Sequence, residues 1–220
     1  MCGRFSMQQT SEKLIERFEI ENSLFTAIPR YNIAPSQIVP IILDNGTRYM
    51  DGLKWGLVPS WSKDKKIGNK LINARAETLA EKPSFRNALK RRRCIIPASG
   101  FFEWKKEGDQ RIPTYIHLKK QKLFAIAGLW EEWQHPDGSM LLTFTIITVA
   151  PNHLMETIHN RMPAILKPEE ESIWLDPSIQ NKNDLQKLLQ PYPEEIMETY
   201  TVSRRVNSPA NDDTDCIKPV

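Results

Sequence analysis

The amino-acid sequence predicts an α+β fold, mostly antiparallel β in a barrel-like sheet, with short helices at its periphery. Strand-like runs outnumber helical ones, and short turns join them, which is typical of antiparallel sheets. Sixteen prolines against nine glycines indicate many loop and strand boundaries, because proline lacks the amide hydrogen that a sheet uses. No repeat, low-complexity linker or shift in composition divides the 220 residues. We therefore expect one domain over 1–220.

The first third of the chain indicates one helix followed by a β-hairpin. Residues 10–19 predict a short amphipathic helix, because their apolar side chains fall on one side. Residues 30–40 are polar and contain prolines, and so predict an ordered loop. The runs 38–43 and 49–55 are strand-like on either side of an Asp-Asn-Gly turn, which is a good hairpin signal.

The middle of the chain contains most of the expected strands. Residues 59–71 are irregular, and short helices are predicted over 74–79 and 84–92, with Ser84 as the N-cap of the second. Glycine-containing turns separate several of the strands. We expect those strands over 94–96, 101–105, 114–118, 123–130 and 141–149.

The last part of the chain predicts short helices over 152–158 and 184–189 and a final strand over 198–202. No apolar run approaches the roughly 18 residues of a membrane-spanning helix, and the first residues lack the apolar core of a signal peptide. We therefore expect a soluble cytoplasmic protein that does not bind membranes. Three cysteines without a Cys-x-x-Cys arrangement argue against disulfides or structural zinc, and we expect no metal and no cofactor.

The formal net charge of +3 says less than its distribution. Arg86 and the run 90–93 form one basic cluster, 63–66 contains a second, and 211–215 is acidic. Positive clusters suit phosphate backbones, so Arg86 is a candidate nucleic-acid contact. The alternative is that such runs are only the solvated face of a helix.

Cys2 follows the initiator methionine directly, and this position gives it chemistry that internal cysteines lack. A small second residue generally permits removal of Met1, which leaves Cys2 with a thiol and a free α-amine. Their ordinary pKa values are about 8.5 and about 7.7–8.0, so both are partly deprotonated near neutral pH. An aldehyde can form a Schiff base with the amine, and the thiol can then close a thiazolidine intramolecularly. The alternative is a small buried hydrophobic residue.

Three further stretches supply polar groups that such chemistry needs. The first offers an amide, a cation and a carboxylate, the second an acidic residue in an aromatic strand, and the third an imidazole beside an arginine. They are Asn73-Ala74-Arg75-Ala76-Glu77-Thr78, Gly100-Phe101-Phe102-Glu103-Trp104 and Ile158-His159-Asn160-Arg161-Met162-Pro163.

Together with the start Met1-Cys2-Gly3-Arg4-Phe5, these stretches closely resemble the SRAP family (SOS response-associated peptidase), whose members form protein–DNA crosslinks at abasic sites. The order and spread of the motifs make the resemblance specific, and it covers nearly the whole chain. The remaining motifs lie at 30–35 (RYNIAP), 55–61 (WGLVPSW), 103–106 (EWKK) and 202–204 (VSR).

The resemblance implies Cys2 as the nucleophile, with Asn73, Glu103 and His159 around it. Burial among aromatic residues would raise the pKa of Glu103 and let it move protons; the alternative is a solvent-facing carboxylate. His159 is expected to protonate the sugar ring oxygen or to assist reversal, or else to be a surface histidine. Asn73 would donate an amide hydrogen to the sugar or to the closing ring, or cap a helix, and both can hold.

Five more residues are candidate DNA contacts. Arg4, Arg75 and Arg161 stand beside the expected catalytic residues, where they would clamp phosphates. Trp55 and Trp61 are candidates for stacking on bases, a contact of roughly 1–3 kcal/mol per base, although tryptophans are commonly packed in the core. We favour Trp61, in a polar loop, for DNA and Trp55, on a strand, for structure.

The leading interpretation is a monomeric sensor that crosslinks to abasic sites in single-stranded DNA during the DNA-damage response. It would be cytoplasmic and associated with the nucleoid when bound to DNA. Its Schiff base would also permit some lyase activity by β-elimination. One alternative is an N-terminal-nucleophile cysteine peptidase, limited to removal of Met1. The other is a non-covalent single-stranded DNA-binding module, which needs the arginines and tryptophans but not Cys2.

Overall fold

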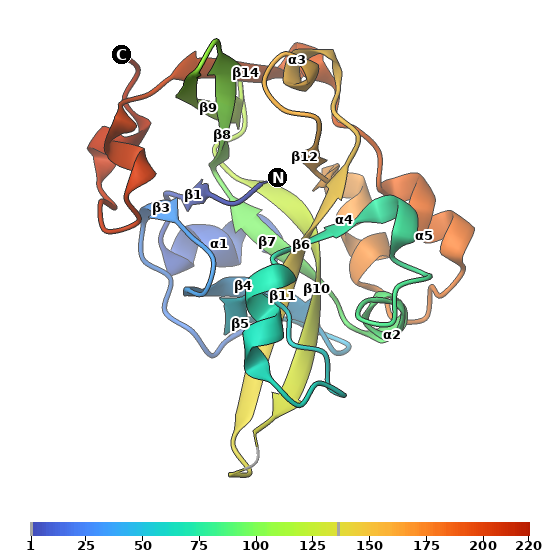
Figure 1. Ribbon diagram of the computed structural model, residues 1–220. Coiled ribbons are helices and arrows are strands. Elements are labelled where there is room, and N and C mark those ends of the chain that lie inside the picture. Colours follow the sequence, from blue (N-terminus) through green and yellow to red (C-terminus); the bar gives the residue numbers. More distant parts are fainter. Residues whose placement is uncertain (1, 136) are drawn as a thin grey trace.

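A computed structural model describes residues 2–135 and 137–220 (Figure 1). Within these residues the strands form a five-stranded sheet, in the order β14-β9-β8-β1-β3, and a nine-stranded sheet. The first sheet consists of β1 (Phe5–Met7), β3 (Arg30–Ile33), β8 (Gly100–Glu107), β9 (Gln110–Leu118) and β14 (Met197–Thr201).

The nine-stranded sheet has the path β12-β11-β10-β7-β4-β5-β2, with β13 beside β10 and β6 beside β11. Most neighbours are antiparallel, and the parallel pairs are β2–β5, β5–β11 and β6–β11. Its strands are β2 (Asn22–Ser23), β4 (Ile38–Asp44), β5 (Arg48–Trp55), β6 (Asn73–Arg75), β7 (Arg93–Ala98), β10 (Phe124–Gln134), β11 (Met140–Val149), β12 (Met162–Pro163) and β13 (Ile165–Leu166).

The helices are short and lie around the sheets (Figure 1), so the expected α+β class with mostly antiparallel strands is confirmed. No helix in the described part of the chain is long and apolar enough to cross a membrane. The α-helices are α1 (Ser11–Phe18), α2 (Arg86–Arg91), α3 (His153–Glu156), α4 (Pro168–Leu175) and α5 (Lys182–Leu188). The 3₁₀ helices are η1 (Lys65–Lys70), η2 (Ala76–Thr78), η3 (Glu194–Ile196), η4 (Arg204–Asn207) and η5 (Thr214–Ile217).

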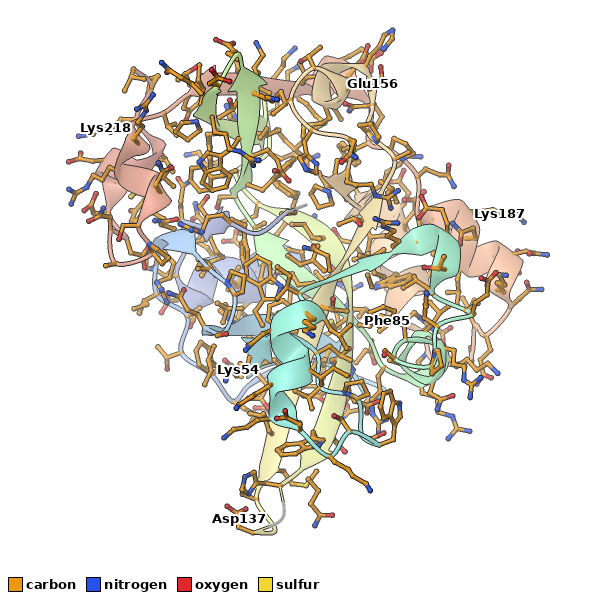
Figure 2. The ribbon with its side chains drawn as sticks, in the orientation of Figure 1. Lys54, Phe85, Asp137, Glu156, Lys187 and Lys218 are labelled. Carbon is orange, nitrogen blue, oxygen red and sulfur yellow. The ribbon has the colours of Figure 1, made fainter. Side chains whose placement is uncertain are left out.

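One hydrophobic core joins the two sheets. Phe5 and Phe101 of the first sheet share a buried cluster with Ile42 and Phe144 of the second. Because strand side chains alternate between faces, Phe102 points away from this core into a smaller cluster with Val206. Figure 2 shows side chains filling the space between the elements, with Asp137, Lys187 and Lys218 at the periphery.

Several local predictions were wrong. Residues 30–33 form strand β3 rather than a loop, because they pair with β1. The segment 74–79 does not form an α-helix: β6 pairs with β11 and only η2 follows it. Helix α2 has Phe85, not Ser84, at its N-cap. Helix α4 was not anticipated, although Pro168 at its start and the acidic first turn are typical helix-start signals.

Candidate functional site

The residues that precede β1 run alongside β8. Phe5 pairs with Phe101 in an antiparallel register, and the Phe102 N–H donates to the Arg4 carbonyl at 2.9 Å. Continuing this register by one or two residues brings the chain at Cys2 beside Glu103 and Trp104. The sheet therefore fixes the spatial relation between the second residue and the acidic residue of the aromatic strand.

Strand β11 brings the other two candidates to the same place. Its residue Ile146 pairs with Asn73 in parallel, and Val149 pairs with Met162, just beyond His159. The Asn73 side-chain amide donates to the Cys2 carbonyl at 3.0 Å. Asn73 thus holds the backbone of Cys2. It does not cap a helix, because it lies in β6.

The Cys2 side chain is fully buried. Its Sγ lies 3.9 Å from the Arg4 carbonyl oxygen. Burial raises the pKa of the Cys2 thiol, and the negative charge of Glu103 raises that pKa further. In this arrangement the thiol is neutral at physiological pH.

Glu103 is also buried, with 3% of its surface exposed, so it is not a solvent-facing carboxylate. Burial raises its pKa, and His159 partly opposes that rise. The His159 Nδ1 lies 3.9 Å from a Glu103 carboxylate oxygen and accepts from the Arg161 N–H at 3.1 Å. The same Nδ1 also lies 3.3 Å from the Arg161 carbonyl oxygen, and whether it donates or accepts depends on the tautomer of the ring.

A cavity of about 390 Å³ opens beside these groups. It is lined by Glu103, Trp104, Arg111, His159 and Asn207. The Trp104 indole N–H donates to the Asn207 side-chain oxygen at 2.8 Å. Sequence reasoning did not select Arg111 or Asn207 as site residues. Neither residue had a sequence signal, since Arg111 lies before the strand expected over 114–118 and its pairing with β8 comes from the structure alone.

Two of the candidate phosphate contacts already have partners within the protein. Arg161 forms a bidentate ion pair with Glu77, at 2.7 and 3.0 Å. Arg4 donates to the Asn32 side chain and to the Val206 carbonyl, both at 2.6 Å. These arginines have structural roles in this arrangement, and a phosphate would have to displace or supplement their partners.

The remaining DNA candidates differ in exposure. Arg75 and Arg86 are exposed, and Trp61 is 57% exposed. Helix α2, which carries Arg86, packs against β7 and β10, two strands without any of the four candidate catalytic residues. The fold therefore brings Arg75 next to the site through β6 but does not bring Arg86 there.

Trp55 is not available to stack on a base, so its inclusion among the DNA contacts was wrong. It is 1% exposed, its indole N–H donates to the Ile72 carbonyl at 2.8 Å, and its ring packs edge-on to Phe5 at a centroid distance of 5.3 Å.

The last residue of the basic run 90–93 also has a structural role. Arg93 is buried and donates to the carbonyl groups of Leu89 and Trp174.

Within residues 2–135 and 137–220, no group of three or more His, Cys, Asp or Glu side chains is placed to hold a metal ion. All three cysteines are free and buried.

The fold and the site define an α+β protein in which a cysteine at the second position meets Asn73, a buried Glu103 and His159. The family described as SOS response associated peptidase (SRAP) matches residues 1–209, and the chain belongs to this family.

The relatives and solved structures are similar over most or all of the chain. Abasic site processing protein YoqW of Bacillus subtilis (strain 168) is 51% identical over 222 residues, which cover 99% of each protein. Abasic site processing protein HMCES of Gallus gallus is 33% identical over 225 residues, 87% of this chain and 66% of that protein. A crystal structure of a Bacteroides thetaiotaomicron protein superposes with a TM-score of 0.92, at 33% identity and full coverage of both chains.

Proposed function

We propose that this protein processes abasic sites in DNA by capturing them covalently in single strands, through the α-amine and thiol of Cys2. The relatives named abasic site processing proteins support the general activity. The observation that carries the covalent mechanism is local. Cys2 is buried beside Glu103, its carbonyl is held by Asn73, and the cavity next to it is lined by His159.

The chemistry begins with hydrolytic removal of Met1, which frees the α-amine of Cys2. The ring-opened abasic sugar presents an aldehyde at C1′. The amine nitrogen attacks this carbon, and loss of water gives a Schiff base. The thiol sulfur then adds to the imine carbon while its proton passes to the nitrogen, which closes the thiazolidine. The ring closure is intramolecular, so proximity favours it.

Glu103 is suited to move protons in these steps. Because its pKa is raised by burial, it retains its proton closer to neutral pH than an exposed carboxyl group does. As an acid it protonates the departing hydroxyl group, and as the resulting carboxylate it relays the thiol proton to the nitrogen. His159, across the same cavity, donates a proton to the sugar ring oxygen as the ring opens, and the C1′ hydroxyl group releases its proton to solvent.

Asn73 has a positioning role in this proposal. Its amide donates to the Cys2 carbonyl, and its side-chain oxygen is buried without a hydrogen-bond partner in the described part of the chain. A buried polar atom without a partner is costly. The Asn73 oxygen is therefore placed to accept a hydrogen bond from the amine or from a sugar hydroxyl group.

The strand is held by contacts that do not depend on base sequence. Arg75 is exposed next to Asn73 and contacts a flanking phosphate, while Trp61 stacks on a base. Arg161 joins them when a phosphate competes with Glu77. A single strand bends into the cavity more easily than a duplex, so single strands are the preferred substrate.

Two other activities follow from the same groups. The Schiff base makes β-elimination at the sugar possible, which gives a minor lyase activity. Peptidase chemistry is confined to the bond between Met1 and Cys2. A non-covalent DNA-binding module remains the second candidate function, because exposed Trp61 and Arg75 serve it without Cys2.

The test incubates the protein, shown by mass to lack Met1, with single-stranded DNA bearing one abasic site. Products are resolved on a denaturing gel beside Cys2→Ala and intact DNA. We expect a shifted band only with wild type and abasic DNA. A denaturant-resistant band with Cys2→Ala would refute the Cys2 mechanism, and no band with wild type would favour the binding module.

A further inference from the structure

Asn32, the third residue of the RYNIAP motif and part of β3, is fully buried and bonds to the C-terminal part of the chain. Its side-chain amide donates to the carbonyl groups of Val206, Ser208 and Asn211, at 3.1, 3.0 and 2.6 Å. A side-chain amide has two hydrogens, so one of them is shared. One buried side chain thus binds the chain turn that follows β14.

Asp212, in the C-terminal part of the chain, bonds back to the backbone of β3. Its carboxylate accepts from the backbone N–H groups of Tyr31 and Asn32, at 2.6 and 2.8 Å, and pairs with Arg30. Residues 206–212, which we call the tail segment, therefore exchange hydrogen bonds with β3 from both sides. Figure 1 shows the C-terminal helical turns beside β3.

Arg4 connects this network to Cys2. The Asn32 side-chain oxygen accepts from Arg4 Nη1 at 2.6 Å, and the same nitrogen donates to Val206. The Arg4 guanidinium lies 5.7 Å from the centre of the Trp104 ring. Its backbone carbonyl is the group that the Cys2 thiol approaches. The position of the Arg4 side chain therefore constrains the chain only two residues after the nucleophile.

The tail segment also forms part of the cavity wall. Asn207 follows Val206, accepts from the Trp104 indole and lines the cavity with Glu103 and His159. Displacement of residues 206–212 would therefore remove one wall of the cavity and the anchor of Arg4 together.

We propose that Asn32 is a positioning residue. By bonding Arg4 to the tail segment, it holds in place residues 2–4, which we call the Cys2 arm, and the side chain of Asn207 in the cavity wall. Its effect on DNA capture rests on the proposed function. The restraint that it places on Cys2 does not, and it can be measured without DNA.

The three buried cysteines are natural reporters. Cys2 lies on the arm, Cys216 lies just beyond the tail segment with its Sγ 3.4 Å from the Asn211 carbonyl, and Cys94 lies in β7 of the core. Site-resolved alkylation by iodoacetamide, followed by mass spectrometry, measures how often each thiol is exposed. For Asn32→Leu we expect Cys2 and Cys216 to react about tenfold faster than in wild type, with Cys94 unchanged. Asn183→Leu, at an exposed asparagine of α5, is the matched control.

Faster alkylation of Cys94 would show that Asn32→Leu destabilises the whole fold. A second variant provides an independent test in that case. Asp212→Ala removes the bonds to β3 from the tail side and leaves the core side chains intact. Faster alkylation of both Cys2 and Cys216 supports the proposal. Faster alkylation of Cys216 alone overturns it, because the tail would then move without affecting the nucleophile.

The same variants are assayed for capture of abasic DNA. We expect the first-order rate at saturating DNA to fall about tenfold while the half-saturating DNA concentration stays the same. A change in half-saturation alone would contradict positioning. Failure of wild type to capture DNA would count against the proposed function, and the alkylation pattern would still decide the role of Asn32.

Discussion

At the scale of single residues, the carboxyl group of Glu103 and the thiol of Cys2 share one buried environment. Burial disfavours the charged form of each group, so the pKa of both Glu103 and Cys2 is raised. A negative charge on Glu103 further disfavours the thiolate of Cys2 and so raises the pKa of that thiol. The folded site therefore favours the protonated form of both groups.

Glu103→Gln tests this electrostatic cost. The raised pKa of Glu103 means that the unfolded chain loses the proton at lower pH than the folded protein. The folded state is therefore penalised above its own pKa, and the penalty disappears below the ordinary value of about 4.3. We expect the Tm of Glu103→Gln to exceed that of wild type by about 2–4 °C at pH 8 and to match it near pH 4. A Tm difference that does not change with pH would contradict this account.

Glu77→Gln tests whether Arg161 can reach DNA. The ion pair with Arg161 lowers the pKa of Glu77, so the two groups are fully charged at neutral pH. Loss of the carboxylate frees Nη1 of the Arg161 guanidinium, while Nη2 still donates to the Thr148 carbonyl group. We expect tighter binding to single-stranded DNA and a salt dependence steeper by about one counterion, measured by fluorescence anisotropy over a salt series. Glu81→Gln removes the same charge from an exposed site nearby, and an equal effect there would show that only net charge matters.

Trp61 is exposed and Trp55 is buried. We therefore expect substitution of Trp61 to affect DNA binding and substitution of Trp55 to affect stability. Trp61→Ala removes an exposed ring, so we expect about tenfold weaker DNA binding and an unchanged Tm. Trp55→Phe leaves the Ile72 carbonyl without its donor, at a cost of about 1–3 kcal/mol, with DNA affinity unchanged. Parallel anisotropy and thermal unfolding measurements decide this. Weaker binding by the Trp55 variant at a temperature where it is folded would reverse the assignment.

The sequence identified which residues form the candidate site, but it did not predict most of the contacts that those residues make. Cys2, Asn73, Glu103 and His159 stood out through family motifs, and the fold brings all four together. Their partners were not predictable in the same way. Asn32 lies in the RYNIAP motif, but its partners at 206–211 and the contact of Asn207 with Trp104 join residues far apart in sequence, which no local pattern predicts.

At the scale of elements, apolar runs located the long strands. The hairpin of β4 and β5 and strands β7 to β11 were predicted to within a few residues, because alternating or continuous apolar residues are what a buried strand requires. Short elements were less predictable. Residues 73–75 form β6 only because β11 offers a free edge, and this tertiary contact overrides the local preference for a helix.

Gly100 illustrates how one element depends on a neighbour. A Cβ at this position of β8 would lie 2.2 Å from the Tyr115 ring, and the Tyr115 hydroxyl group is hydrogen-bonded to Ser6 and Gln8. We expect Gly100→Ala to destabilise the protein by about 1–3 kcal/mol, measured by urea unfolding. In a Tyr115→Leu background the same substitution should cost much less. Equal costs in both backgrounds would show that the ring is not the obstacle.

At the scale of the whole molecule, the beginning and the end of the chain meet at the site. The arm that carries Cys2 is paired with β8 near the middle of the sequence, while Asn32 and Arg4 bind residues 206–212. We expect contacts of such large sequence separation to form late in folding, because the loop-closure entropy must be overcome before they stabilise the fold.

The position of the tail segment has a consequence during protein synthesis. A ribosome releases the chain from its N-terminus, at about 5–20 residues per second, so Cys2 emerges long before Asp212. Residues 206–212, which bind Arg4 and Asn32, therefore leave the exit tunnel well after Cys2. A nascent chain that ends before residue 206 therefore contains Cys2 without the contacts that hold Arg4 in place, and these contacts form only after residues 206–212 have emerged.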